Sequence, residues 1–374
     1  MKAARSVVHQ RGTRPAVALV SLALLLSACA TSKNSGSGGG SSASPSVNKF
    51  LACEVTDTGG IDDRSFNASA LQALKEAHAE NGMQYAYLQS QSGSDYVPNI
   101  KQFEQRGCGI IVTNGYLMGN QTYAAAKADP SQKFAIIDYG YSKNLPNLQG
   151  LTYQTDQDAF LGGYLAAAMS KTGKVGTFGG MDIPTVTIYM DGYAAGVRYY
   201  NQKNGKSVQV LGWDPEKNTG SFTNDFVNQA KGKSVTQALM NQGADVIFPV
   251  AGQVGLGAVA AVQQNNEANP SAPVYMEWVD NDGCISVPQA CNLFITSVEK
   301  GIVASVKQAA NSAMDGTFKG GTYVGTLSNG GVALAPFHDF QSKIPADVQS
   351  ELNTITSGIE DGSISVDPKS YPAS

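Results

Sequence analysis

Apolar and polar positions alternate along the chain with two different periods. Short runs rich in Val, Ile and Phe predict buried strands. Between them lie longer segments in which apolar residues recur every three or four positions, as in amphipathic helices. Strands and helices take turns from residue 49 almost to the C-terminus. This alternation predicts parallel sheets covered by helices on both faces, because parallel strands need a crossover connection.

The predicted elements fall into two successive sets. The first set has strands at 50–55, 83–89, 109–113, 133–138 and 148–153, with helices at 65–81, 96–106 and 118–128. The second set has strands at 174–178, 207–211, 245–250, 273–279, 293–296 and 322–327. Its helices are expected at 156–170, 185–202, 226–242, 256–266, 298–314 and 346–359. Two such sets predict an α/β protein with two Rossmann-like lobes, whose parallel sheets are joined by a hinge.

The lobes are expected to exchange segments of chain. We predict an N-terminal lobe of residues 49–153 plus 280–320, and a C-terminal lobe of residues 154–279 plus 321–374. The crossings between them should then fall near 153–156, 279–282 and 317–324, and the lobes should rotate about these segments to trap a solute.

The first 28 residues have the pattern of a secretory signal peptide. A basic start without acidic residues precedes an apolar run at 16–26, which is too short to span a bilayer. Leu-Ser-Ala-Cys at 26–29 resembles the bacterial lipobox, in which the cysteine, here Cys29, is lipidated. An ordinary cleavage site with a chance cysteine is the alternative. Residues 29–48 are rich in Ser and Gly and predict a tether. We therefore expect an extracytoplasmic protein that is lipid-anchored to the cell membrane.

Length, charge and histidine content limit the remaining possibilities. At roughly 150 residues per domain, 374 residues suit two domains after the leader is removed. The 26 basic residues against 30 acidic ones argue against nucleic acid as a partner. Only three His occur, far apart and without metal-binding motifs. We therefore expect no metal and no cofactor.

Four cysteines follow the lipobox, and an even number in an exported chain suggests disulfides. Cys284 and Cys291 close a short loop and are the easiest pair. Cys53 in the first strand and Cys108 before another strand could meet if those strands are neighbours. Buried free thiols are the alternative.

Polar and aromatic residues gather in the loops that follow the strands, where ligands bind in open parallel sheets. They include Asp57 to Asn67, Asn114-Gly115, Asp138, Phe222, Gly252, Asp280 and Lys300. Rings stack on flat ligands, and carboxylates accept hydrogen bonds from hydroxyl or ring N–H groups. The set predicts a binding site for a neutral polar solute with an aromatic face.

The same loops carry a specific resemblance. Asp-Thr-Gly-Gly-Ile-Asp-Asp-Arg-Ser-Phe-Asn at 57–67 resembles the signature of the basic membrane protein (BMP) family of ABC-transporter lipoproteins, which includes purine nucleoside receptor A-type proteins. Further similar motifs follow in order at 163–167, 174–180, 192–197, 243–247, 279–282 and 296–300. The resemblance covers residues 49–340 and implies the type I periplasmic-binding fold. It also implies a permease as partner and a nucleoside as ligand.

The resemblance implies roles for individual residues. The base would stack between Phe66 and Phe222, and its edge would meet Asp57 and Asn114. The ribose would be held by Asp280, Gly252 and Lys300. Asn67 of the signature and Asp138 at a strand end complete the predicted site. The segments at 220–225 and 282–284 depart from the family pattern.

Each of these residues also has a purely structural interpretation. Phe66 would then be a core contact, Asp57 and Asp280 would cap local structure, and Lys300 would be a surface charge. For the whole protein we predict a monomeric solute receptor of an ABC importer that prefers purine nucleosides. A receptor for another neutral solute such as a sugar is the alternative. An extracytoplasmic nucleoside-processing enzyme is disfavoured, because the sequence shows no nucleophile–base pair, so we expect no enzymatic activity.

Overall fold

The computed structural model describes residues 49–366. The predicted signal peptide, Cys29 and the tether lie outside this range. Among the described residues, no helix has both the length and the apolar character to cross a membrane.

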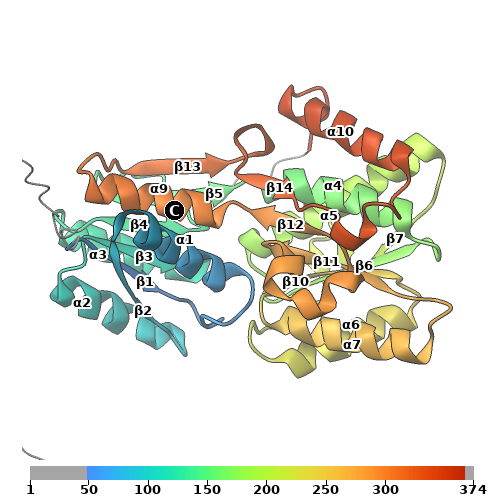
Figure 1. The fold of residues 1–374 in the computed structure, drawn as a ribbon, viewed down its shortest axis with the longest axis horizontal. Coiled ribbons are helices and arrows are strands. Elements are labelled where there is room, and N and C mark those ends of the chain that lie inside the picture. The colour runs from blue at the N-terminus through green and yellow to red at the C-terminus, as the bar shows by residue number, and fades with distance from the viewer. Residues whose placement is uncertain (1–48, 367–374) are drawn as a thin grey trace, which may run out of the picture. The chain divides into compact units, whose positions relative to one another are not determined.

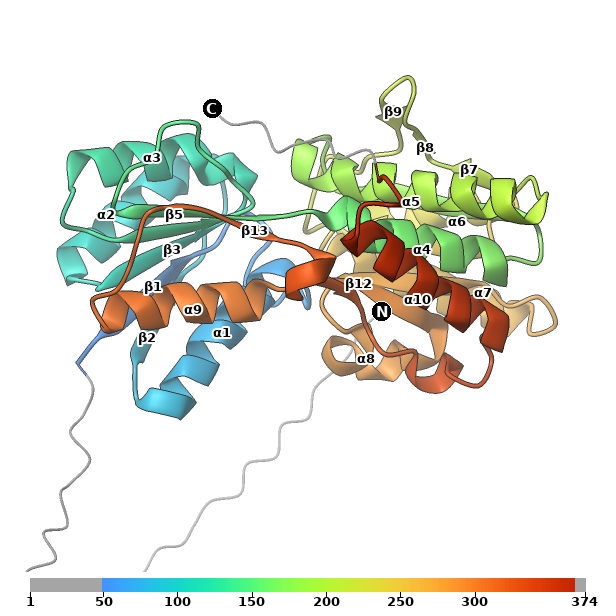
Figure 2. The same cartoon turned by 90° about the horizontal axis from the view of Figure 1, so that it is seen from above.

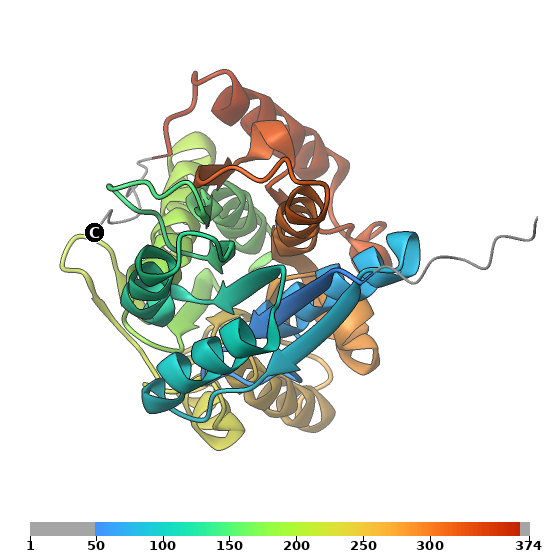
Figure 3. The ribbon, with the colours of Figure 1, turned by 90° about the vertical axis from the view of Figure 1, so that its left-hand side faces the viewer.

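The first lobe is built on one sheet with the strand order β13-β5-β4-β3-β1-β2. All its neighbouring strands are parallel. Figure 3 looks at this lobe from its outer end and shows the blue to teal strands side by side. The strands are β1 (Leu51–Val55), β2 (Gln84–Leu88), β3 (Ile110–Asn114), β4 (Phe134–Ile137), β5 (Leu148–Tyr153) and β13 (Gly321–Gly325).

Helices cover both faces of this sheet. Helices α1 (Phe66–Asn81) and α9 (Ile302–Met314) pack on one face, and α2 (Tyr96–Arg106) and α3 (Gly119–Ala128) on the other (Figure 2). Side chains of β1 point to both faces of the sheet. Ala52 packs in the hydrophobic core beneath α1, and Val55 packs in the core beneath α2. A sheet buried on both faces explains why its strands are apolar nearly throughout.

The second lobe repeats this arrangement with the strand order β7-β6-β10-β11-β12-β14. Its strands are β6 (Lys174–Gly179), β7 (Gln209–Leu211), β10 (Val246–Val250), β11 (Tyr275–Asp280), β12 (Phe294–Lys300) and β14 (Val332–Leu334). Only β14 is antiparallel to its neighbour in this sheet. One face carries α4 (Thr155–Met169), α5 (Pro184–Asn204) and α10 (Ala346–Glu360), and the other carries α6 (Gln229–Asn241) and α7 (Val254–Ala268) (Figure 1). The predicted pair of α/β lobes is confirmed.

The glycine-containing motifs of α4 and α5 allow these two helices to pack closely. A Cβ atom at Gly163 would collide with the carbonyl oxygen of Tyr193, and one at Gly196 would collide with that of Phe160. The motifs at 163–167 and 192–197 therefore serve helix packing in the core of the second lobe.

The chain crosses between the sheets at three places (Figure 1). The first, between β5 and α4, falls at the predicted position. The second lies between β12 and α9, and the third between β13 and β14. The crossings predicted at 279–282 and 317–324 are therefore wrong in position, because the observed ones come later in the chain.

The predicted lobe boundaries and one predicted helix need correction accordingly. Residues 280–320 were assigned to the first lobe, but β12 belongs to the second sheet and only α9 to the first lobe. Residues 321–374 were assigned to the second lobe, but β13 belongs to the first sheet. The helix expected from residue 298 begins at Ile302. Val298 continues β12 because it pairs with Val279 on one side and with Leu334 of β14 on the other.

Both predicted disulfides are present, Cys53–Cys108 and Cys284–Cys291. The first joins β1 to Cys108, two residues before the start of the neighbouring strand β3. The second joins two cysteines seven positions apart and closes the loop that begins in the short helix α8 (Gly283–Ser286).

Two minor elements complete the structure. A hairpin of β8 (Trp213–Asp214) and β9 (Thr219–Gly220) extends from the second lobe after β7. Short 3₁₀ turns η1–η5 lie at Gly93–Asp95, Tyr116–Met118, Pro288–Leu293, Leu327–Asn329 and His338–Phe340.

Candidate functional site

A cavity of about 60 Å³ lies where the carboxyl ends of strands from both sheets meet. Seven of the nine predicted ligand-binding residues line it: Asp57, Phe66, Asn67, Asp138, Gly252, Asp280 and Lys300. Further lining side chains outside those nine predicted residues are Asp63, Tyr116, Tyr189, Phe226 and Gln253. The two lobes therefore share one polar and aromatic cavity.

Asp57 follows β1, and one of its carboxylate oxygens accepts hydrogen bonds from within the protein. Its Oδ1 accepts hydrogen bonds from the Gly59 N–H (2.8 Å) and from Asn67 Nδ2 (2.8 Å). Its Oδ2 lies against Gly115, where a Cβ atom would be only 3.0 Å away. Gly115 also has a φ of 102°, in the region that favours glycine. Burial raises the pKa of Asp57, and the nearby charge of Asp280 adds to that shift.

Asp63, rather than Asp57, caps the start of α1. Its carboxylate accepts hydrogen bonds from the backbone N–H groups of Ser65 (3.0 Å), Asn67 (2.7 Å) and Ala68 (3.0 Å). Burial raises the pKa of Asp63 to about 7, although these three bonds oppose the shift. The interpretation of Asp57 as a helix cap is therefore wrong, and Asp57 is left to face the cavity.

Lys300 is the cation of the cavity and bridges the two lobes. Its Nζ donates to Asp138 Oδ2 of the first lobe at 2.7 Å, and lies 3.6 Å from Asp280 Oδ1 of the second. The ammonium is also 5.0 Å from the centre of the Phe66 ring and 5.2 Å from that of Tyr189, within cation–π range. Lys300 is only 5% exposed, so it is not a solvated surface charge.

The carboxylates outnumber this single cation. Burial raises the pKa of Asp138 to about 6, although Lys300 opposes the shift. Burial lowers the pKa of Lys300, but Asp138 and Asp280 outweigh that effect and raise it above its ordinary value. Asp138 Oδ1 is buried and has no hydrogen-bond partner among residues 49–366. The cavity thus offers hydrogen-bond acceptors in a negative environment.

Asp280 connects the lobes through its carboxylate. Ser65 of the first lobe donates its hydroxyl to Asp280 Oδ2 at 2.6 Å, and Tyr189 of the second lobe donates to Oδ1 at 2.9 Å. Asp280 ends β11 with φ 70°, and Asp138 follows β4, the corresponding strand of the first sheet, with φ 66°. Left-handed backbone in non-glycine residues costs about 1–3 kcal/mol and concentrates at functional sites. The two lobes thus place a strained aspartate at equivalent strand ends.

Two predicted site residues lie outside the cavity. Asn114 is fully buried behind it, and its amide donates to Glu54 (2.6 Å) and to Asn67 Oδ1 (3.0 Å). Phe222 bridges to Gly179 of β6, and its ring packs edge-on against Trp213 at 6.0 Å. The predicted direct contacts of Asn114 and Phe222 with a ligand are therefore not supported by the geometry.

Phe226 takes the position expected for Phe222. Helix α6 begins at Gln229, later than predicted, because the Asn228 side chain accepts hydrogen bonds from the Ala230 and Lys231 N–H groups. Phe226 therefore remains in the loop, where its ring lies against Gly180 and lines the cavity. Asn228 before a helical pattern was a capping signal that could have revealed this start.

Tyr189 was missed for a different reason. It lies inside α5, fully buried, and an aromatic residue on a helix is ordinarily a core contact. Its hydrogen bond to Asp280, its contact with the Lys300 ammonium and its place on the cavity wall distinguish it from Tyr193, the other buried tyrosine of this helix.

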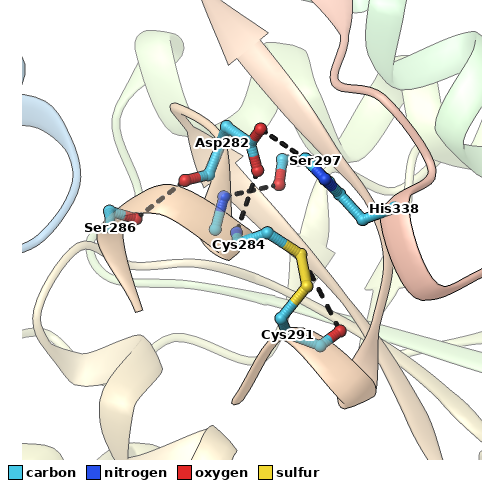
Figure 4. The surroundings of a disulfide bond; sticks show 7 residues. Asp282, Cys284, Ser286, Cys291, Ser297 and His338 are labelled. Carbon is cyan, nitrogen blue, oxygen red and sulfur yellow. Dashed lines mark hydrogen bonds and ion pairs between the residues drawn. A yellow bond between two sulfur atoms is a disulfide. The ribbon is translucent and has the colours of Figure 1, made fainter. Parts of the chain in front are cut away.

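A second polar group lies beside the Cys284–Cys291 disulfide (Figure 4). His338 Nε2 is 2.7 Å from Asp282 Oδ2, and Asp282 Oδ1 accepts from the Cys284 N–H at 2.9 Å. Asp, Cys and His are common metal ligands, but a disulfide sulfur is not a thiolate. We assign this group a structural role, which is to tie the α8 loop to the segment after β14.

Comparison with known proteins agrees with this architecture. The family model described as ABC transporter substrate-binding protein PnrA-like matches residues 50–366. The ABC transporter nucleoside-binding protein BmpA of Lactococcus lactis is 32% identical, over 85% of this chain and 89% of that protein. Basic membrane protein A1 of Borrelia garinii is 30% identical, over 80% of this chain and 83% of its own length.

A solved structure shares the fold. The crystal structure of an ABC transporter solute-binding protein from Aeropyrum pernix superimposes with a TM-score of 0.77 at 24% identity, covering 86% of this chain and 94% of that one.

Proposed function

Because this chain belongs to the PnrA-like family of ABC-transporter substrate-binding proteins, we propose that it captures nucleosides in the cavity between its lobes and delivers them to a permease for import. Purine nucleosides are the preferred ligands in this proposal. The family resemblance seen in the sequence is confirmed, and so is the expectation that the protein is a binding protein and not an enzyme. As a substrate-binding protein of an ABC transporter it acts outside the cytoplasm.

The observation that carries the proposal is the combination of rings and acceptors around one cavity. Phe66 and Phe226 supply an aromatic ring from each lobe, which suits a flat base. Asp57, Asp138 and Asp280 supply acceptors for ring N–H and hydroxyl groups. A nucleoside has a flat base with two faces and several hydrogen-bond donors, and it carries no charge that three carboxylates would repel.

We assign the sugar to Asp280, Gly252 and Lys300. Each oxygen of Asp280 already accepts one protein hydroxyl, and a carboxylate oxygen can accept a second donor. The base side is assigned to Asp57 Oδ2. Asn67 already donates to Asp57 and accepts from Asn114, so we give it the role of orienting Asp57. The nucleoside-binding relative in Lactococcus supports this choice of ligand.

Isothermal titration calorimetry tests the proposal directly. The protein should bind inosine, and inosine 5′-monophosphate should bind at least about tenfold more weakly, because its phosphate would meet the carboxylates. Recovery of intact inosine should accompany binding. If free sugars bind and no nucleoside does, the ligand assignment is wrong and the sugar alternative replaces it.

The remaining parts of the proposal concern the assembly. We propose that Cys29 carries lipid, that residues 29–48 tether the lobes to the membrane, and that the receptor works as a monomer. One acyl chain holds a protein only marginally, so stable anchoring requires the two or more chains typical of such lipoproteins.

A further inference from the structure

Glu54 is a buried carboxyl group that the ligand assignment does not use. It lies in β1, is fully buried, and faces α1 on the same side of the sheet as Ala52. One carboxyl oxygen lies 2.6 Å from Asn114 Nδ2, and the other has no hydrogen-bond partner among residues 49–366. A buried polar group with an unsatisfied atom calls for a physical explanation.

A chain of hydrogen bonds leads from Glu54 to the cavity. Asn114 donates one amide hydrogen to Glu54 and the other to Asn67 Oδ1, at 3.0 Å. Asn67 in turn donates to Asp57 Oδ1 at 2.8 Å and to Asp63 Oδ2 at 3.2 Å. An amide has distinct donor and acceptor ends, so each bond in this chain fixes the orientation of the next side chain.

We propose that Glu54 is a positioning residue, which fixes through Asn114 and Asn67 the direction in which Asp57 presents its second oxygen to the ligand. The inference rests on the proposed function in one respect, namely that Asp57 contacts the ligand. Without the anchor at Glu54, Asn114 loses one of its two acceptors and is freer to turn, which weakens one of the bonds that orient Asn67.

The protonation state of Glu54 gives this role a distinct signature. Burial raises its pKa to about 8, with Asp63 and Asp57 adding to the shift while Asn114 and Lys75 oppose it. At neutral pH the group is therefore mostly uncharged. Ionisation would leave a buried charge with one unpaired oxygen, which is unfavourable unless water enters or the side chains rearrange. Ligand affinity should consequently fall as the pH rises through about 8.

The chain contains a matched control. Glu277 in β11 is also fully buried, and burial alone raises its pKa to about 8. It does not line the cavity, and neither of its carboxyl oxygens has a hydrogen-bond partner among the described residues. Substitution of Glu277 removes a similar buried carboxyl group without touching the chain from Glu54 to Asp57.

The binding experiment uses Glu54→Ala, Glu54→Gln and Glu277→Gln, titrated with inosine by calorimetry between pH 7 and 9.5. Glu54→Ala should bind inosine at least about tenfold more weakly at pH 7. Glu54→Gln, which mimics the uncharged acid, should bind within about twofold of wild type at pH 7 and lose the decline above pH 8. Glu277→Gln should keep the wild-type affinity and the wild-type decline.

A second measurement does not depend on the ligand. The side-chain amide resonances of Asn67 and Asn114 are recorded by ¹H–¹⁵N NMR in the ligand-free proteins. Glu54→Ala should shift both pairs of resonances, and Glu277→Gln should shift neither. Raising the pH through 8 should move the Asn114 pair in wild type but not in Glu54→Gln. If Glu54→Ala does not fold, Glu54→Gln and its pH profile decide the matter.

The two proposals fail in different ways. If wild type does not bind inosine, the proposed ligand is wrong, and the NMR comparison alone judges the positioning role. If wild type binds inosine and Glu54→Ala binds it equally well, Glu54 does not position the site. The same conclusion follows if the Asn67 resonances do not respond to Glu54.

Discussion

Ser65 offers a test of lobe closure at a residue that does not itself line the cavity. It occupies the N-cap position of α1, yet its hydroxyl makes no capping hydrogen bond to the helix. The hydroxyl instead reaches the second lobe, where Asp280 Oδ2 accepts it at 2.6 Å and the Val279 carbonyl at 3.1 Å. Because Asp63 caps α1, Ser65→Ala removes an interlobe bond without removing the helix cap.

The size of the effect follows from the charge of the acceptor. A hydrogen bond to a charged group contributes roughly 1.5–3 kcal/mol. This bond joins the lobes and is lost when they separate, so the substitution disfavours the closed form that holds the ligand. At about 1.4 kcal/mol per tenfold, inosine should bind between about tenfold and about 100-fold more weakly. Ser65 does not line the cavity, but its partner Asp280 does, so the scattering measurement below separates a loss of closure from a change in how Asp280 meets the ligand.

Calorimetry with inosine measures this loss, and small-angle scattering with and without inosine measures closure. Ser90→Ala is the matched control, because Ser90 is equally buried but its hydroxyl accepts a hydrogen bond from Asn99 within the same lobe. The control should bind inosine like wild type. Wild-type affinity in Ser65→Ala would show that this bond contributes nothing to closure, and identical scattering profiles with and without saturating inosine would argue against lobe rotation altogether.

Three further predictions address the ligand and the anchor. Wild type should bind 2′-deoxyinosine at least about tenfold more weakly than inosine, and Asp280→Asn, which tolerates the left-handed backbone, should reduce that discrimination; an unchanged ratio in calorimetry would refute the sugar-side assignment. Phe226→Ala should weaken inosine and deoxyinosine by similar factors, at least about tenfold, whereas Phe222→Ala should leave inosine affinity within about threefold of wild type; the reverse order would restore Phe222 as the stacking residue. Cys29→Ser should move the protein from the membrane fraction to the soluble fraction, as judged by immunoblotting, and continued membrane association would count against lipid anchoring.

Much of the fold was predictable because periodicity reports local burial. The alternation of strand and helix signals predicted two parallel sheets, and the rule that ligands bind at strand ends led to Asp57, Asp138 and Asp280. The short loop between Cys284 and Cys291, and the placement of Cys53 and Cys108 at strands that could be neighbours, likewise anticipated the two disulfides. These features depend on residues near one another in the chain, or on the general geometry of parallel sheets.

Partners distant in the chain were decided only by the tertiary structure. Val298 remains in a strand because β14 pairs with β12 from more than thirty residues later. Phe226 rather than Phe222 reaches the cavity because the path of one loop places Phe222 against Trp213.

The polar network beneath the cavity was likewise decided by the tertiary structure. Glu54, Asn114 and Asn67 come from three different elements, and nothing in their local patterns indicates that they meet. Tyr189 resembles an ordinary core residue of α5 until Asp280 comes within reach of its hydroxyl. Local sequence determines which faces of each element are apolar, whereas the packing of the elements and the closing of two lobes determine which buried polar groups become partners.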